Sequence, residues 1–478
     1  MCHPTNQSQS QSQSQATIDI STSTTELTQL TQRTVPQVQQ WINAILHGDS
    51  PDDKRDLLDK LKSVSAYPGP VDMLVEAIPI LVQVMTEVNQ MMATFACEIL
   101  VNLVAEPVHG KLQTETNISA MVQASGIEVV VTILMNDDSP LKLAEGCCKL
   151  VFNLCSMGTF EGASRHYPCV IEAVKYVMLQ WKDEVSFQKY ACQALYMMCE
   201  GNQTEHADAN SKKAIESGCV QAVVGAMQRH ADTQDTDLIS TAIAALVNFS
   251  FAEGDAAKSV ICKLGAIEEV VKAMQKNPNA RKVQDHGCRF MRSIACYEGF
   301  EPTHDIILCV INAMRSYIHD GDMQERGCAA LWNITANESS GASITETGGV
   351  QVILDAMKNH RHHEGAQEHA IGALWNLAVR AERLREEIFA AGGIELIVKG
   401  MATHRGKGGV GKEGAGALFH LSMTKDCRIR LKLVESGAIP ELRYVFSENT
   451  CHWQNMNACF DTGRLLQRIE MALLNLGE

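Results

Sequence analysis

The chain has 478 residues, of which 45% are hydrophobic, 20% charged and 5% aromatic, and its formal net charge is −15. This length allows one extended repeat array or two to three compact domains. The acidic balance argues against nucleic-acid binding, which needs a basic surface to neutralise phosphate. No apolar run approaches the ~20 residues of a membrane-spanning helix, and the N-terminus has no apolar signal core, so we expect a soluble protein of the cytoplasm or nucleus without membrane insertion.

The negative charge is concentrated in the first half of the chain. Residues 36–250 carry a net charge of −12, whereas residues 251–478 carry −2. An acidic first half suits a partner that has basic segments, because opposite charges steer association. A merely solubilising surface is the alternative.

The cysteines predict a reducing compartment. There are seventeen, an odd number, and no Cys-x-x-Cys pair occurs. Such cysteines behave as small buried hydrophobes when they sit in apolar runs. We expect this of Cys97, Cys147, Cys192, Cys288 and Cys328. Two glycosylation-type sequons begin at Asn248 and Asn333 inside predicted core helices, which again favours the cytosol.

Four segments follow one another along the chain. Residues 1–34 are rich in Gln, Ser and Thr, cannot bury enough apolar surface to fold, and are predicted to be a disordered tail. Residues 35–69 are predicted to form a helical N-terminal cap. Residues 70–445 repeat a helical pattern, and residues 446–478 are predicted to end in an amphipathic cap helix.

Self-similarity at a fixed period is the strongest signal in residues 70–445. A Met that ends a predicted helix recurs at steps of 47, 40, 43 and 44 residues. These residues are Met227, Met274, Met314, Met357 and Met401. An Asn-type position in a following helix recurs at 102, 153, 197, 248, 293, 333, 376 and 420. Glycines that open the middle helix recur at Gly126, Gly218, Gly265, Gly349, Gly393 and Gly437.

Each repeat is predicted to contain a short helix, a left-handed Gly turn, a second helix, a polar loop and a longer third helix. One repeat cannot cover its own apolar stripe, so stability requires stacking. With its segment Leu374-Trp375-Asn376-Leu377, the chain resembles the armadillo-repeat family of β-catenin and its relatives. The resemblance implies an all-α, right-handed α-solenoid of about nine repeats, eight clear and one degenerate.

The resemblance also implies that the third helices line a concave groove, where an Asn side chain binds the backbone of an extended partner segment. An amide offers both a donor and an acceptor, which matches a peptide unit. Carried over by position, the ladder consists of Asn102, Asn153, Asn248, Asn333 and Asn376. Met197, Ser293 and His420 interrupt it. The alternative is that these Asn side chains only satisfy backbone groups between repeats.

The residue before each Asn-type position forms a second stripe, which contains Phe152, Tyr196, Arg292, Trp332, Trp375 and Phe419. These side chains could form pockets for a partner, or they could be core between repeats. We expect Trp332, Trp375, Arg292 and His420 to join the ladder in the partner-binding groove. Importin-α-like receptors carry a Trp one helical turn before the Asn, where this chain has Ala329 and Gly372. That departure weakens an import-receptor function.

Three catalytic or ligand-binding motifs are set aside. Gly406–Lys412 resembles a phosphate-binding loop, but Glu413 stands where a magnesium-binding hydroxyl is required. His360, His362, His363 and His369 have no metal-ligand spacing on a helix, and solvated loop histidines explain them better. No Ser/His/Asp or Cys/His set can be nominated as a catalytic group. We therefore expect no enzyme, no metal and no cofactor.

The sequence predicts a non-catalytic scaffold or adaptor, monomeric, that binds extended or helical segments of other proteins, including basic ones. A nuclear import adaptor that recognises basic peptides is the alternative. A nucleotide-binding protein that uses the degenerate Gly406–Lys412 loop is a lesser one.

Overall fold

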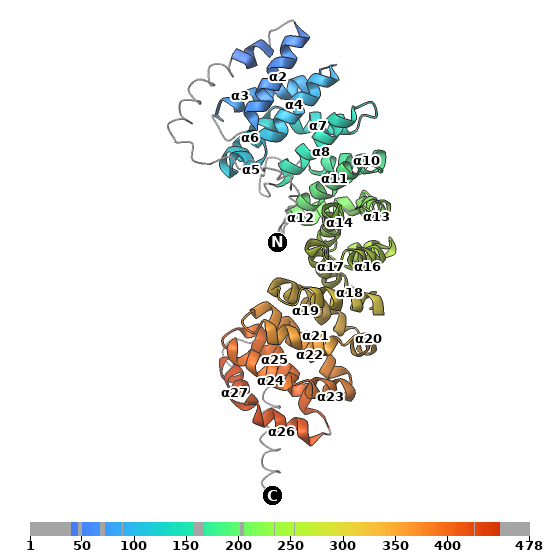
Figure 1. The fold of residues 1–478 in the computed structure, drawn as a ribbon, viewed down its shortest axis with the longest axis vertical. Coiled ribbons are helices and arrows are strands. Elements are labelled where there is room, and N and C mark those ends of the chain that lie inside the picture. Colours follow the sequence, from blue (N-terminus) through green and yellow to red (C-terminus); the bar gives the residue numbers. More distant parts are fainter. Residues whose placement is uncertain are drawn as a thin grey trace, which may run out of the picture. The chain divides into compact units, whose positions relative to one another are not determined.

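The computed structural model describes residues 40–45, 50–66, 72–87, 89–156, 167–200, 205–233, 235–252, 254–424 and 426–449 (Figure 1). Within these ranges the regular elements are α-helices and no strand occurs. The predicted all-α class is confirmed. The predicted tail at 1–34 and most of the predicted cap at 446–478 lie outside the described residues.

The chain divides into two compact units, Met1–Val129 and Val130–Glu478. In unit 1 residues 40–45 are helical, the helices α2 to α6 follow, and α7 continues into unit 2. The bounds are α2 (Pro51–Ser65), α3 (Asp72–Met85), α4 (Gln90–Leu103), α5 (Glu106–His109), α6 (Lys111–Gln123) and α7 (Gly126–Leu134). Helix α4 packs on α2 and α3, and Leu58, Ile78 and Leu100 are fully buried in this core. Helix α2 falls inside the predicted N-terminal cap.

Unit 2 is a succession of short helices that follow the predicted repeats. Its helices are α8 (Leu141–Ser156), α10 (Tyr167–Gln180), α11 (Val185–Met198), α12 (Glu205–Glu216), α13 (Cys219–Arg229), α14 (Thr236–Phe249), α15 (Asp255–Lys263), α16 (Ala266–Lys276), α17 (Arg281–Ile294), α18 (His304–Ser316), α19 (Gly321–Ala336), α20 (Ser340–Glu346), α21 (Gly349–Asn359), α22 (Glu364–Arg380), α23 (Glu382–Ala390), α24 (Gly393–Thr403), α25 (Gly408–Ser422), α26 (Cys427–Glu435) and α27 (Ala438–Asn449).

The third helices form the continuous core of unit 2. They are α8, α11, α14, α17, α19, α22 and α25, and each one packs against the next (Figure 1). The second helices α13, α16, α18, α21 and α24 pack along a parallel row. The Met that ends a second helix is buried, with 2% or less of Met227, Met274 and Met314 exposed. Because each apolar stripe is covered by the neighbouring repeat, stacking rather than any single repeat makes the core.

Left-handed turns connect first and second helices, but three of them do not use the predicted glycine. Gly218 and Gly265 have φ values of 84° and 76°, as predicted. In two repeats the left-handed residue is the preceding glycine, Gly348 (φ 70°) or Gly392 (φ 79°). The predicted Gly349 and Gly393 instead begin the second helix, where a Cβ would meet Ile344 or Ile388 at 3.0 Å or less.

At Gly126 the same correction applies, and here no second glycine is present. Ser125 takes the left-handed conformation with a φ of 57°, and a Cβ on Gly126 would lie 2.6 Å from Met121 Cγ. A residue with a Cβ is strained in this region, since its side chain crowds the backbone. Ser125 thus makes the left-handed turn, and the adjacent Gly126 allows the close approach of Met121.

The repeat of α18 and α19 departs from the predicted three-helix pattern. Residues 295–303 precede α18 and contain no helix, so this repeat has only its second and third helices. In place of a first helix, the side chain of Phe300 is buried, with 2% of its surface exposed. The Phe300 carbonyl accepts a hydrogen bond from Asn337 Nδ2 at 2.9 Å.

A buried glutamine joins the second and third helices in four repeats. Its Nε2 donates to the carbonyl of the Met that ends the second helix and to a carbonyl three residues further on. We call this the glutamine clamp; its members are Gln188, Gln284, Gln324 and Gln367, each 1–2% exposed. For Gln324 the acceptors are Met314 and Tyr317, at 2.8 and 2.9 Å. The clamp satisfies carbonyls that a helix end leaves without intrahelical partners.

Two further expectations can be compared with the structure. All five cysteines predicted to lie in the core, from Cys97 to Cys328, are buried. Among the described helices, none is by itself both long and apolar enough to cross a membrane; α6 and α7 meet the length and composition test only together, and the chain bends between them.

Candidate functional site

The Asn ladder of unit 2 runs along the third helices, and three of its members tie their helix to the preceding third helix. Asn248, Asn333 and Asn376 each donate from Nδ2 to a backbone carbonyl of the preceding third helix, at 2.8–2.9 Å. The acceptors are Tyr196, Arg292 and Trp332, the stripe residues of those helices. Each Asn side chain is therefore held in one orientation by its neighbour.

The oxygen of each amide remains available. Among the described residues, Oδ1 of Asn333 and of Asn376 accepts no hydrogen bond, and both side chains are partly exposed. Asn248 and Asn153 are more enclosed, at 6% and 9% exposed. A fixed amide with a free acceptor can receive a backbone N–H from a partner chain. For Asn333 and Asn376 the structure shows the bond between repeats, and it leaves Oδ1 without a partner among the described residues.

Asn102 stands alone in unit 1. Its Nδ2 donates to Ser65 Oγ at 3.1 Å, and that hydroxyl donates in turn to the Lys62 carbonyl at 2.8 Å. Ser65 ends α2, so Asn102 joins α4 to α2. The interaction follows the pattern of the ladder, although the acceptor is a hydroxyl instead of a carbonyl.

The two tryptophans lie between neighbouring third helices and remain partly exposed. A Cβ on Gly372 would lie 2.6 Å from Trp332, and a Cβ on Gly416 would lie 2.6 Å from Trp375. Each indole therefore packs flat on a glycine of the next helix. His369 lies beside Trp332, with ring centroids 5.6 Å apart. Because glycine has no side chain, the rings can pack against the next helix. Each ring thus contacts the neighbouring repeat and is also partly exposed to solvent.

Arg292 and His420 close the predicted set. Arg292 is exposed, and its carbonyl accepts the Asn333 amide while its guanidinium forms no ion pair with any described residue. His420 lies between Trp375 and Phe419, with ring centroids 6.4 and 5.2 Å apart. We call the surface formed by the ladder and stripe residues of unit 2 the third-helix face.

Two carboxyl groups on α25 and α22, outside the ladder and the stripe, have raised pKa values. Burial raises the pKa of Glu413 to about 7, Lys412 opposes the shift, and Glu368 adds to it. Burial also raises the pKa of Glu368, with Glu364 adding to the effect. Close carboxylates in low dielectric resist ionisation together. The buried Glu413 carboxyl is therefore harder to ionise than an exposed one.

The glycine-rich segment 406–412 is the entry to a helix. Gly406 is left-handed with a φ of 81°, Lys407 is the N-cap of α25, and α25 begins at Gly408. Both lysines are engaged by carboxylates: Lys407 Nζ lies 3.1 Å from Glu364, and Lys412 Nζ lies 3.7 Å from Glu413. The preceding element is the helix α24, whereas a phosphate-binding loop follows a strand.

The histidine cluster has structural contacts instead of converging side chains. His360 Nε2 pairs with the Ile318 carbonyl at 2.7 Å, and His363 caps α22 by accepting from the Ala366 N–H at 3.3 Å. His369 packs on Trp332, and burial lowers its pKa. Among the described residues, no three His, Cys, Asp or Glu side chains are grouped closely enough to hold a metal ion.

Two features of this region were missed in the sequence. Cys296 is exposed, and its Sγ accepts from Asn333 Nδ2 at 3.0 Å. The glutamine clamp was missed as well, although each clamp residue follows the second-helix Met, or Met178, by ten positions. The buried thiols are inert by comparison: burial raises the pKa of Cys192 and of Cys328 to about 12.

Comparison with known proteins shows which solved structures have a similar fold. No protein-family model and no curated protein sequence matches the chain. An engineered protein of known structure matches over 91% of this chain and 98% of its own, at 20% identity and a TM-score of 0.71. A structure from work on a phosphorylation switch that controls the interaction between cadherin and β-catenin covers 90% of this chain and 82% of its own. Its identity is 15% and its TM-score 0.69. A designed armadillo repeat protein matches 54% of this chain, at 18% identity and a TM-score of 0.44.

The two long matches establish an armadillo-type α-solenoid fold. The fold expected from the repeat pattern is therefore confirmed. At these identities the likeness concerns the fold, and function has to be argued from the chain's own residues.

Proposed function

We propose that the chain is a non-catalytic scaffold or adaptor that binds segments of other proteins along its third-helix face. The observation that carries this proposal is the state of Asn333 and Asn376. Their Nδ2 groups are fixed at 2.8 and 2.9 Å from carbonyls of the preceding helix, while Oδ1 is left without a partner among the described residues. Fixed acceptors lose little entropy when they bind, which favours recognition.

The spacing of the third helices suits an extended segment. Packed helices lie about 8–10 Å apart, and an extended chain advances about 3.3 Å per residue. Successive Asn acceptors would then receive every second or third backbone N–H of a bound segment. Trp332 and Trp375 flank these acceptors with partly exposed rings, and aromatic side chains of this kind often anchor protein interfaces. Such a face would bind the backbone of a segment through the Asn side chains and its side chains through the rings.

The import-adaptor alternative is less favoured by the packing at Gly372. An importin-α-like receptor has a Trp at this position, but here the Trp332 ring already covers the glycine, and even a Cβ would come within 2.6 Å of it. Arg292 also presents an exposed cation on the face, which does not favour a lysine-rich peptide at that point. A basic partner for the acidic first half remains a separate prediction.

Selection from a displayed library of unstructured peptides tests the proposal. The full chain should enrich peptides that lose at least about tenfold in affinity for the double variant Asn333→Ala/Asn376→Ala. The control is Asn337→Ala, which removes an amide bond to the Phe300 carbonyl at 2.9 Å, outside the ladder, together with the bonds from Ser339. If the double variant and the control bind the selected peptides equally well, the face does not bind partners through its Asn side chains.

The non-catalytic part of the proposal has its own test. ATP with magnesium should leave the thermal unfolding of the chain unchanged, because ligands stabilise only the proteins that they bind. A saturable increase in melting temperature that Lys412→Ala abolishes would instead support a nucleotide site at Gly406–Lys412.

A further inference from the structure

The repeat of α13 and α14 lacks the glutamine clamp and has a longer connection between its two helices. Met227 and Asn248 are 21 positions apart, whereas the corresponding pairs Met274–Ser293 and Met314–Asn333 are 19 apart. The clamp residue stands four positions after the N-cap of its third helix, as Gln324 does after Asp320. Counted from the N-cap Asp235 of α14, that position is Ile239.

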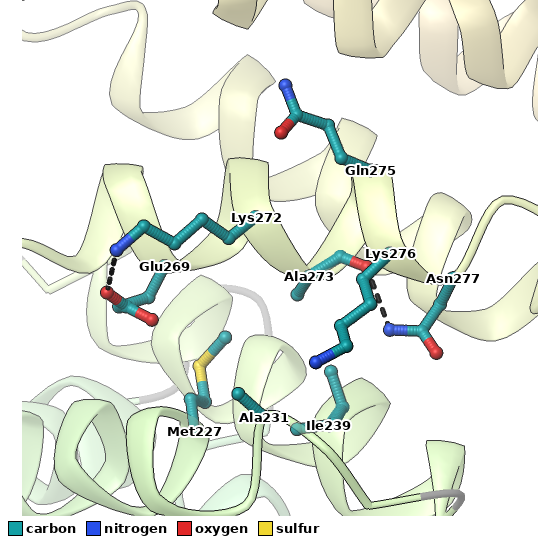
Figure 2. A pocket seen from close by; sticks show the side chains of 9 residues that line it. All are labelled: Met227, Ala231, Ile239, Glu269, Lys272, Ala273, Gln275, Lys276 and Asn277. Atoms are coloured by element: carbon teal, nitrogen blue, oxygen red, sulfur yellow. Dashed lines mark hydrogen bonds and ion pairs between the residues drawn. The ribbon is translucent and has the colours of Figure 1, made fainter.

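A hollow of about 430 Å³ lies at this site, between α13, α16 and the start of α14. Figure 2 shows its lining, with Met227 and Ala231 on one side and the α16 side chains on the other. Ile239 cannot donate to the helix-end carbonyls as glutamine does, and the longer connection leaves more space to fill. The volume falls within the range of small-molecule sites, about 300–1,000 Å³.

The hollow has an apolar floor and a charged rim. Met227, Ala231 and Ile239 form the floor, and two lysines of α16 stand above it. Lys272 extends toward Glu269, and its Nζ lies 2.8 Å from that carboxylate, which is only 8% exposed (Figure 2). Lys272 is therefore already engaged inside the hollow.

Lys276 is placed differently. Its side chain extends from α16 toward Ala231 and Ile239, over the floor (Figure 2). Its ion-pair partner is Asp232, whose side chain is 96% exposed and belongs to the long connection itself. An exposed ion pair contributes little free energy, because water competes for both charges and the side chains lose freedom when they pair. Another carboxylate can therefore replace Asp232 on Lys276. The contact with Asp232 shows that the Lys276 ammonium binds a carboxylate at the mouth of the hollow.

We infer that this hollow is a second binding site, which takes an amphipathic anion: a compact apolar group that fills the space over Met227 and Ile239, with a carboxylate that replaces Asp232 on Lys276. Two sources share this chemistry, a free medium-chain fatty acid and the carboxyl end of a peptide whose last residue is apolar. Burial of the apolar group would supply most of the affinity, and the ion pair would supply selectivity for the acid.

This site is separate from the third-helix face. Ile239 and Asn248 both belong to α14, and nine residues of helix separate them by about 13 Å. The floor of the hollow comes from the end of α13 and the beginning of α14, whereas the Asn248 side chain reaches back to the Tyr196 carbonyl. The inference goes beyond the proposed function and can hold or fail without it.

Calorimetric titration of the full chain tests the inference with octanoate as the probe. We expect saturable binding at one site, and affinities at least about tenfold lower for octanol and octylammonium. A peptide that ends in Leu carboxylate is compared with its amidated form, which identifies whether a peptide end is bound as well. Lys276→Gln should weaken octanoate about tenfold, while Lys358→Gln, on the second helix α21, should leave it unchanged.

Two variants change the floor of the hollow by different means, one by bulk and one by polarity. Ile239→Trp occupies it with a ring, and Ile239→Gln places the clamp residue of four other repeats there; both should abolish octanoate binding, and the second should keep the helical spectrum. Equal binding of octanoate and octanol, unchanged binding in both Ile239 variants, or no saturable binding at all would overturn the inference.

Discussion

The repeat of α13 and α14 and the repeat of α18 and α19 have the same marker residues but close their helix ends differently. In the latter, the buried Gln324 donates to the carbonyls of Met314 and Tyr317. In the former, Ile239 stands at the clamp position, the connection is longer, and a hollow remains. In this repeat the missing clamp, the longer connection and the hollow occur together.

The comparison distinguishes two kinds of residue position that recur along the solenoid. The Met and Asn positions build the stack in both repeats, since Met227 and Met314 are buried and Asn248 and Asn333 bond to the preceding helix. Stacking does not require a glutamine at the clamp position, since the repeat of α13 and α14 stacks with Ile239 there. The repeat of α13 and α14 keeps its place in the stack without the clamp, and a hollow lies beside it.

Removing a clamp should have the largest effect. Gln324→Ala leaves the carbonyls of Met314 and Tyr317 without their donor and leaves a void behind, and both effects destabilise. We expect a loss of about 3 kcal/mol in the free energy of unfolding, measured by urea denaturation, with faster hydrogen exchange in α18 and α19. The control is Gln351→Ala, which loses only an exposed bond to Asp355. Equal losses in the two variants would show that the clamp does not stabilise the repeat.

The repeat of α24 and α25 also lacks the clamp, with Gly411 at that position, and it contains the buried ionisable side chain of Glu413. Burial raises the pKa of Glu413 from 4.5 to about 7. The unfolded chain then releases this proton at a lower pH than the folded chain, so stability falls as pH rises from about 4.5 to about 7. Glu413→Gln should stabilise the protein at pH 8 by about 3 kcal/mol at most, and little at pH 4. A difference between variant and parent that is the same at both pH values would contradict this assignment.

Glycine substitutions sharpen the contrast between a closed and an open repeat. At Gly372, on α22 of a clamped repeat, a Cβ would lie 2.6 Å from Trp332, so Gly372→Ala should destabilise by about 2 kcal/mol. At Gly225, on α13 of the open repeat, a Cβ would meet nothing within 4 Å, so Gly225→Ala should stabilise by about 0.5–1 kcal/mol. Thermal unfolding of both variants gives the two signs. The same sign for both would mean that the packing at Gly372 has been misread.

The smallest effect is expected at the left-handed turn in unit 1. Ser125 has a φ of 57°, where the equivalent positions of other repeats have glycine. Ser125→Gly relieves the strain at the cost of some backbone entropy, and a net gain of about 0.5 kcal/mol is expected from denaturant unfolding. Gly218→Ser introduces the same strain in the other direction and should destabilise. A gain for Gly218→Ser would contradict the argument.

Much of the fold could be predicted from the sequence, because stacked repeats copy their core positions. The Met markers end the second helices, and the Asn-type positions fall on the third helices. The turn residues could not be assigned fully, since Gly348-Gly349 and Gly392-Gly393 offer two glycines and only the backbone decides which one is left-handed. The missing first helix before α18 was also hidden, because the markers lie on the other two helices.

The candidate site was less accessible to sequence reasoning. The spacing found Asn333 and Asn376 but could not tell a bond between repeats from a free acceptor, and the structure contains both in one amide. The clamp obeys a spacing as regular as that of the Asn residues, yet a buried glutamine has no distinctive pattern in one repeat. Its absence at Ile239 becomes meaningful only once Gln284, Gln324 and Gln367 are seen to bind carbonyls.

Photo-crosslinking most directly tests whether the third-helix face binds partner segments. A peptide selected on the full chain is synthesised with a photoreactive side chain at successive positions, irradiated in the complex, and its attachment points are read by mass spectrometry. We predict crosslinks on α19 and α22 around Trp332 and Trp375, and their loss when Asn333 and Asn376 are both replaced by Ala. Attachment confined to the second helices α18 and α21, unaffected by that double substitution, would contradict the proposed binding face.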